Sequence, residues 1–270
     1  MALKSILVQT NIDDNNEGRV KVAAGLADRF GASLIGVSAC AIQPITSSGM
    51  AAGVDLFVED PEDIKKQLQA LEKAFRDASG GKGNGIEWRG AIGFPTEHAT
   101  HQTRAADLIV TGQSESGSAY RKVNPADLVM LTGRPVLVVP QAVTELAADR
   151  IVVAWKDTRE ARRAVLDSLP FLEKASEVIV VSVAFADDRE AGNSAADVTA
   201  FLRKHDIKAR DVRLDPKGSA GDQIIGHAVE RRADLIVAGA YGHNRLREWI
   251  FGGVTRDLLT RSPVCCLLSN

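Results

Sequence analysis

Short apolar runs alternate with amphipathic segments along much of the 270-residue chain. In the second half, β-branched apolar runs predict strands near 150–155, 177–184, 209–214, 234–238 and 264–268. Between them, apolar residues recur every three or four positions, which predicts helices within 158–175, 194–207 and 219–233. Strands that alternate with helices favour right-handed crossovers and a parallel sheet covered on both faces.

The same pattern occurs twice in the sequence. Three segments recur in the same order: SILVQT and RIVVAW (5–10 and 150–155), AADLIVTG and RADLIVAG (105–112 and 232–239), and RPVLVVP and SPVCCLL (134–140 and 262–268). Copies of about 130 residues have the length of domains and are too long for solenoid repeats. The pattern therefore predicts an α/β protein of two tandem doubly wound domains, each a five-stranded parallel sheet flanked by helices.

The two predicted domains cover residues 1–140 and 149–270. The connection between them is about ten residues long, so we expect the halves to pack on one another as a pseudo-symmetric pair. The first copy has an additional stretch, residues 42–60, whose small and turn-forming residues predict a surface excursion or a flap.

Composition and charge narrow the classes of partner. The chain is 45% hydrophobic and 25% charged with a formal charge of −2, which gives no reason to expect nucleic acid or an anionic membrane as an electrostatic partner. No apolar run approaches the roughly 18 residues needed to cross a bilayer, and the first residues turn acidic too early for a secretory signal. We therefore expect a cytoplasmic protein, in which Cys40, Cys265 and Cys266 are reduced and buried.

Glycines follow the strand predicted near 234–238. Gly239 and Gly242 allow close approach of the backbone to a ligand, and Gly252 and Gly253 open a predicted helix whose free amides favour an anion. Thr255 adds a hydroxyl in the first turn. Ligands of open α/β sheets collect at the carboxyl ends of the strands, which favours a phosphate site; the alternative is that the glycines serve only turns and tight helix packing.

The spacing Gly239-x2-Gly242-x9-Gly252, followed by Gly253, Val254 and Thr255, resembles the ATP-binding signature of universal stress proteins. The resemblance extends over both copies of the repeat. It implies a stress-response protein that binds ATP or AMP, with magnesium as an accompanying ion, in a cleft across the ends of the first and second strands. Carried over by position, the resemblance implies contacts to ribose from Ala154, Trp155 and Lys156, to adenine from Val183, and to phosphate from Gly239, Gly242, Gly252, Gly253, Val254 and Thr255.

Three positions of the second copy depart from the signature. Gly253 replaces a serine or threonine and so removes a hydroxyl. Lys156 replaces an aspartate, although Asp157 follows, and a lysine cannot accept hydrogen bonds from ribose. Trp155 replaces a small residue and could either stack on a base or plug the pocket.

The first copy departs further. Glu115 and the pair Pro125 and Ala126 stand where the signature has glycines, and Asn11 stands where it has the aspartate. A glutamate repels phosphate, and proline lacks the amide that would bind it. We therefore expect the first domain to be a degenerate partner that supports the second.

Catalysis and metal binding have little support in the sequence. His98 and His101 are three residues apart on a predicted helix, but no third ligand is evident, so no metal site and no catalytic residue are predicted. The chain is expected to be a binder, with ATP hydrolysis slow at most, that acts through ligand-controlled conformation or association, including homodimerisation. The alternative is a nucleotide-free dimerisation or interaction module of the same fold.

Overall fold

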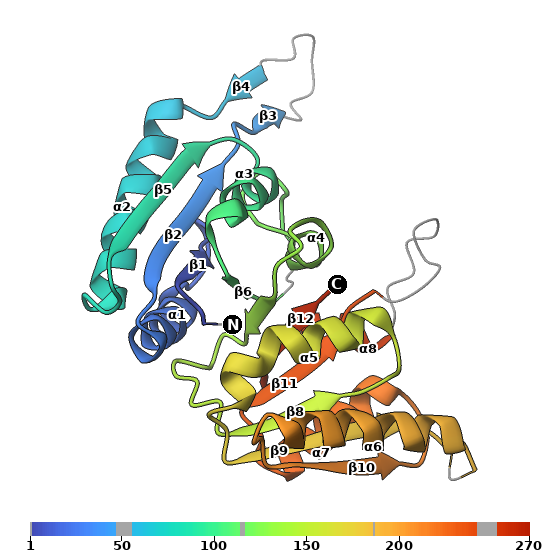
Figure 1. The fold of residues 1–270 in the computed structure, drawn as a ribbon. Helices are drawn as coiled ribbons and strands as arrows, with labels where there is room; N and C mark the ends of the chain where they lie inside the picture. The colour runs from blue at the N-terminus through green and yellow to red at the C-terminus, as the bar shows by residue number, and fades with distance from the viewer. Residues whose placement is uncertain (1, 47–55, 114–116, 186, 242–252) are drawn as a thin grey trace.

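The computed structural model describes residues 2–46, 56–113, 117–185, 187–241 and 253–270. Ten strands in these segments form one sheet (Figure 1). The first half supplies β1 (Ser5–Gln9), β2 (Ser33–Cys40), β5 (Ile86–Ile92), β6 (Leu108–Gly112) and β7 (Val136–Val139). The second half supplies β8 (Arg150–Ala154), β9 (Glu177–Val183), β10 (Ala209–Leu214), β11 (Leu235–Gly239) and β12 (Cys265–Ser269).

The strand order is β10-β9-β8-β11-β12-β7-β6-β1-β2-β5. All neighbours within a half pair parallel, whereas β7 and β12 pair antiparallel, with Val138 opposite Cys266 and Leu137 opposite Leu267. The sheet therefore continues from one half into the other. The division into domains at 1–140 and 149–270 stays a prediction.

Helices cover both faces of the sheet. One face carries α1 (Glu17–Phe30), α2 (Pro61–Ser79), α5 (Arg159–Leu172) and α6 (Arg189–Lys204). The other carries α3 (Pro95–Gln102), α4 (Pro125–Leu131), α7 (Ala220–Glu230) and α8 (Gly253–Thr260). A 3-10 turn, Thr103–Ala105, follows α3. Each face is thus a continuous hydrophobic core, and the described helices include none that is both long and apolar enough to span a membrane.

The predicted α/β fold is confirmed, and in the second half every predicted strand is found within two residues of its expected bounds. Helix α6 begins at Arg189, earlier than expected, because Asp188 caps it by accepting a hydrogen bond from the amide of Ala191 at 3.0 Å. Its first turn is polar and carries no apolar repeat, so the hydrophobic pattern alone places the start too late.

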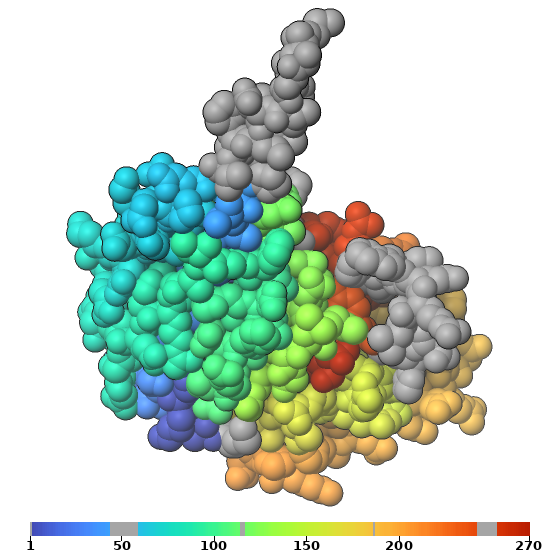
Figure 2. All heavy atoms as spheres, turned by 90° about the horizontal axis from the view of Figure 1, so that it is seen from above, coloured from blue at the N-terminus to red at the C-terminus, as the bar shows by residue number. Residues whose placement is uncertain are grey.

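The additional stretch of the first half contains a short antiparallel pair, β3 (Pro44–Thr46) and β4 (Leu56–Val58). The connection between the halves packs back onto the first half, where Leu146 and Ala148 are buried in the core and the carbonyl of Ala147 accepts a hydrogen bond from Arg29. From above, the two halves lie against each other in continuous contact (Figure 2).

Candidate functional site

The carboxyl ends of β8, β9 and β11 meet at one edge of the second half. Ala154, the last residue of β8, lies opposite Val181 of β9 on one side and Ala238 of β11 on the other. The chain leaves β8 toward β9 in one direction and returns to β11 on the other side, so this edge is the point where the strand order reverses. Open α/β sheets bind ligands at such a point. The structure therefore brings the predicted residues Ala154, Val183 and Gly239 to the edge expected from the sequence.

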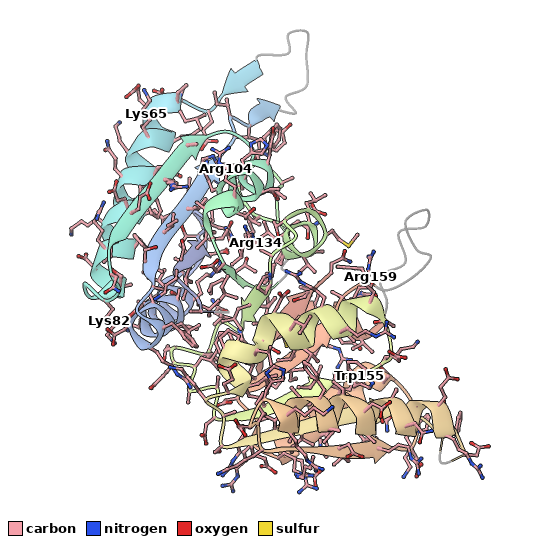
Figure 3. The ribbon with its side chains drawn as sticks, in the orientation of Figure 1. Lys65, Lys82, Arg104, Arg134, Trp155 and Arg159 are labelled. Atoms are coloured by element: carbon pink, nitrogen blue, oxygen red, sulfur yellow. The ribbon has the colours of Figure 1, made fainter. Side chains whose placement is uncertain are left out.

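Trp155 lies in the core and not over this edge. Its side chain is only 8% exposed, and the indole Nε1 donates a hydrogen bond to Ser194 Oγ of α6 at 3.2 Å (labelled in Figure 3). Its backbone amide donates to the carbonyl of Val181 at 2.8 Å. The indole fills space between the sheet and α6, so it neither plugs the edge nor lies ready to stack on a base.

Lys156 is the exposed basic residue that follows. Its carbonyl accepts a hydrogen bond from the Thr158 amide at 2.7 Å, and its ammonium has no ion pair within the described part of the chain. The neighbouring Asp157 already has a partner, because its carboxylate accepts from Arg162 Nε at 3.0 Å. At this edge the ammonium of Lys156 is thus available to an anion while the carboxylate of Asp157 is engaged.

Gly239 is required by packing. A Cβ added there would lie 2.5 Å from the carbonyl carbon of Glu160, because the first turn of α5 passes directly against the end of β11. The tight-packing alternative therefore accounts for this glycine. It also has a chemical consequence, since the amino end of α5, the positive end of the helix dipole, is held beside the edge.

The remaining signature residues divide into two groups. Gly253 begins α8 and is exposed, Val254 is half-buried, and the Thr255 side chain is only 6% exposed. Gly242 and Gly252 lie outside the described residues.

A buried carboxylate that the sequence reasoning missed belongs to Glu160, whose backbone packs against Gly239. The Glu160 side chain is 3% exposed; its Oε1 accepts from Arg159 Nε at 3.2 Å, and its Oε2 has no hydrogen-bond partner within the described segments. Ser269, paired in register with Gly239, also has a buried hydroxyl to which no described residue is hydrogen-bonded. Neither residue belongs to a recognisable motif, so burial in the folded chain is the only signal that marks them.

The equivalent edge of the first half is closed by its own chain. The guanidinium of Arg121 donates to Asp13 at 2.6 and 3.0 Å, to Glu59 at 2.7 Å and to Gln67 at 2.9 Å. The hydrogen bond from Arg121 holds the pKa of Asp13 below its usual value. The carbonyl of Tyr120 accepts from the Ala41 amide at 2.8 Å, so the segment around Arg121 covers the ends of β1 and β2.

Charged side chains also fill the space beside Gly112, the first-half counterpart of Gly239. A Cβ at Gly112 would lie 2.7 Å from the Arg19 guanidinium. Asp14 pairs with Arg19 at 3.1 Å and with Lys122 at 2.9 Å. Burial raises the pKa of Asp14, but hydrogen bonds from Asn11 and Lys122 outweigh it, and the pKa is lowered overall.

The remaining first-half positions that depart from the glycine signature are Asn11, Glu115, Pro125 and Ala126. Asn11 Oδ1 accepts from the Val123 amide at 3.0 Å, which ties the covering segment to the end of β1. Pro125 and Ala126 form the first turn of α4, and Glu115 lies outside the described residues.

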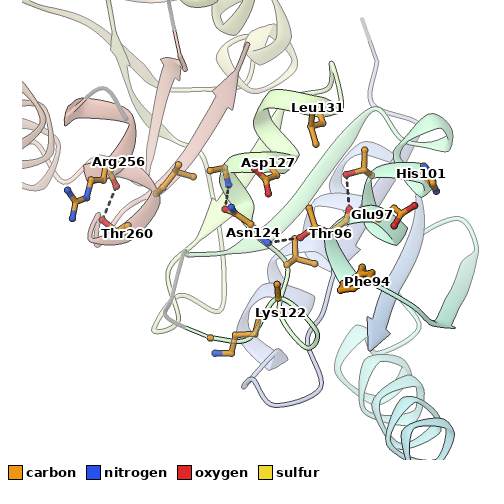
Figure 4. A pocket seen from close by; sticks show the side chains of 16 residues that line it. Phe94, Thr96, Glu97, His101, Lys122, Asn124, Asp127, Leu131, Arg256 and Thr260 are labelled. Atoms are coloured by element: carbon orange, nitrogen blue, oxygen red, sulfur yellow. Dashed lines mark hydrogen bonds between the residues drawn. The ribbon is translucent and has the colours of Figure 1, made fainter. Parts of the chain in front are cut away.

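A groove of about 990 Å³ lies where the two halves meet, between α3 and α4 of the first half and α8 of the second (Figure 4). Exposed Phe94 and Leu131 line it together with Arg256, and Thr96 Oγ1 accepts from the Asn124 amide at 3.0 Å within its wall. His101 lines the groove, but the described residues include no cluster of three or more His, Cys, Asp or Glu that could hold a metal ion.

Comparison with protein families and solved structures identifies the fold. The model of the universal stress protein family matches residues 172–269. A universal stress protein from Archaeoglobus fulgidus DSM 4304 superimposes with a TM-score of 0.71 at 16% identity, over 98% of this chain and 96% of that chain. A putative universal stress protein from Pseudomonas aeruginosa UCBPP-PA14 gives a TM-score of 0.62 at 16% identity, over 99% of this chain and 93% of that chain.

No curated protein matches the sequence. The two solved structures share the fold over nearly the whole chain, and the family model matches within the half that carries the glycine motif. Residues 172–269 therefore match the universal stress protein family, and the chain as a whole has the fold of universal stress proteins.

Proposed function

We propose that the chain is a cytoplasmic stress-response protein that binds an adenine nucleotide, ATP or AMP, at the carboxyl ends of β8, β9 and β11. The proposal rests on one contrast between the halves. In the first half the covering segment and its ion pairs close this edge, whereas in the second half Lys156 is exposed there without an ion pair in the described chain. The match of residues 172–269 to the family supports the same half as the binding half.

Each group at the edge has a role in this proposal. Lys156 pairs with a phosphate, and the amino ends of α5 and α8 add amides and the positive ends of two helix dipoles. Backbone at Ala154 and Val183 borders the base and ribose. Gly253 contributes its amide in place of a hydroxyl, while Val254 and Thr255 hold the first turn of α8 against the core.

Magnesium is compatible with this edge. Glu160 offers a carboxylate oxygen of the kind that Mg²⁺ prefers, since its buried Oε2 has no hydrogen-bond partner among the described residues. One carboxylate is sufficient when phosphate oxygens and water complete the coordination. The residues of this edge supply binding and orientation only, so the proposal assigns no hydrolytic step to them, and any turnover of ATP is expected to be slow.

The test is a calorimetric titration of the wild-type chain and of Lys156→Ala with ATP, AMP and adenosine. Loss of a charge-assisted contact to phosphate weakens ATP about tenfold or more and leaves adenosine unchanged. Lys208→Ala is the matched control, because Lys208 is also exposed but lies before the amino end of β10. Equal ATP affinity in Lys156→Ala and the wild type would remove this lysine from the site.

The groove between α3, α4 and α8 favours the second candidate, a nucleotide-free interaction module. Native mass spectrometry of the freshly purified chain separates the two. A retained AMP or ATP mass supports nucleotide binding. No retained mass, together with no thermal shift on adding ATP, supports the interaction module, and sedimentation velocity then reports whether the chain pairs with a second copy.

A further inference from the structure

Phe185 is a large aromatic residue exposed beside the proposed nucleotide site. It lies two residues beyond Val183, the end of β9, and 66% of its surface is exposed. A single exposed apolar residue is common and carries no meaning alone. Its position matters here, because β9 neighbours β8 and the edge formed by these two strands is the one that Lys156 follows.

Backbone hydrogen bonds are made at Phe185 and at its neighbour Ala184, although the Phe185 side chain is exposed. The amide of Ala184 donates to the carbonyl of Leu214 at 3.1 Å, and the amide of Asp188 donates to the carbonyl of Phe185 at 3.1 Å. Asp188 in turn caps α6. A phenylalanine ring has only two side-chain torsions, so it loses little conformational freedom when a ligand covers it, which favours recognition of a flat apolar surface.

The first half has a different residue at the position equivalent to Phe185. Strand register aligns Ser33 of β2 with Glu177 of β9, and this places Ala41 at the position of Phe185. Ala41 is 6% exposed, and its amide is bonded to the carbonyl of Tyr120 in the covering segment. A small residue thus lies under the chain's own backbone in one half, and an aromatic ring is exposed at the same place in the other.

We infer that Phe185 stacks on the base of the bound nucleotide and gives the site its preference for a flat aromatic ring. This inference rests on the proposed nucleotide site. Stacking needs only the face of a ring, so Phe185 is a positioning residue that fixes the base while Lys156 and the helix ends hold the phosphates. In this inference Phe185 contacts the base and Lys156 contacts the phosphate. Ligands with and without a phosphate therefore distinguish the two contacts.

The experiment measures the affinities of adenosine and AMP for the wild type, Phe185→Ala, Phe185→Trp and the control Leu166→Ala. Leu166 is 52% exposed on α5 of the same half, so its truncation removes a comparable exposed side chain away from the edge. Phe185→Ala weakens adenosine and AMP by the same factor, about 5- to 100-fold, and Phe185→Trp restores both. Leu166→Ala leaves both affinities unchanged.

The outcomes distinguish the inference from the proposed function. If the wild type binds AMP and Phe185→Ala binds it equally well, the stacking role is overturned and the nucleotide site stands. If the wild type binds neither ATP nor AMP, the proposed function fails first and the inference fails with it. If Phe185→Ala keeps its affinity but converts a dimer to a monomer in sedimentation velocity, the ring belongs to a contact between copies and the inference is overturned.

Discussion

Gly239 and Gly112 occupy equivalent positions for different physical reasons. A Cβ at Gly239 would meet the backbone of α5, which cannot move without shifting a helix, whereas a Cβ at Gly112 would meet the end of the flexible Arg19 side chain. A glycine is therefore needed for close helix packing in the second half, whereas in the first half it leaves room for a charged side chain.

Gly239→Ala is expected to destabilise the fold by about 1–3 kcal/mol, the usual cost of forcing an extra carbon into a packed site. Gly226→Ala is the control, because Gly226 lies in α7 with no atom within 4 Å of an added Cβ, and alanine there is expected to stabilise by about 0.5–1 kcal/mol. Urea denaturation gives both values. A Gly239→Ala variant as stable as the wild type would show that α5 does not pack against β11 as described.

His227 makes stability depend on pH. Its side chain is buried on α7, and desolvation, followed by the charge of Arg231, lowers its pKa below the ordinary value of 6.5. The unfolded chain then binds the proton more readily, so this contribution to stability is full above about pH 6.5 and is lost as the pH falls through the lowered folded pKa.

We therefore expect the melting temperature to drop between pH 7.5 and pH 5.5 by less in His227→Gln than in the wild type. Thermal denaturation at the two pH values measures this difference. His101→Gln changes an exposed ring and serves as the control. Equal drops in the wild type and His227→Gln would mean that other groups cause the pH dependence.

At the scale of elements, the hydrophobic period of the sequence predicts most strands and helices because each element buries one face or both. The hydrophobic period does not predict the polar start of α6 or the short pair of β3 and β4, because a helix cap and strands of three residues are too short to show a repeat. The hydrophobic period also does not predict the pairing of β7 with β12, because both strands are largely apolar and nothing in their sequences specifies a partner.

Leu137 and Leu267 test this pairing, because they lie opposite each other across the junction and both are fully buried. Each single change to alanine is expected to cost about 2–5 kcal/mol. The double variant should depart from the sum of the singles by about 0.5–3 kcal/mol, as contacting residues do. Chemical denaturation of the four chains gives this coupling; additive effects would show that the two strands are not in contact.

At the scale of the whole molecule, the halves share a strand order, and in the first half Arg121 and its partners cover the ends of the strands. Sequence reasoning predicts a degenerate first half from Glu115, Pro125 and Asn11. It does not anticipate that Arg121 would close that half, because the partners of Arg121 come from three separate segments of the chain. The sequence names Trp155 but does not predict the burial of its indole, and it does not single out Phe185. The burial of Trp155 depends on the position of α6, and the exposure of Phe185 depends on where β9 ends.

The antiparallel junction of β7 and β12 has a consequence for assembly. Joining the halves through these strands leaves β5 and β10 at the two ends of the described sheet. Both terminal strands interleave charged residues, with Glu87 and Arg89 on β5 and Arg210, Asp211 and Arg213 on β10. Charged edge strands resist the addition of further strands. The charges on β5 and β10 thus disfavour end-to-end association of sheets, so a second copy of the chain is expected to dock elsewhere than at these two strands.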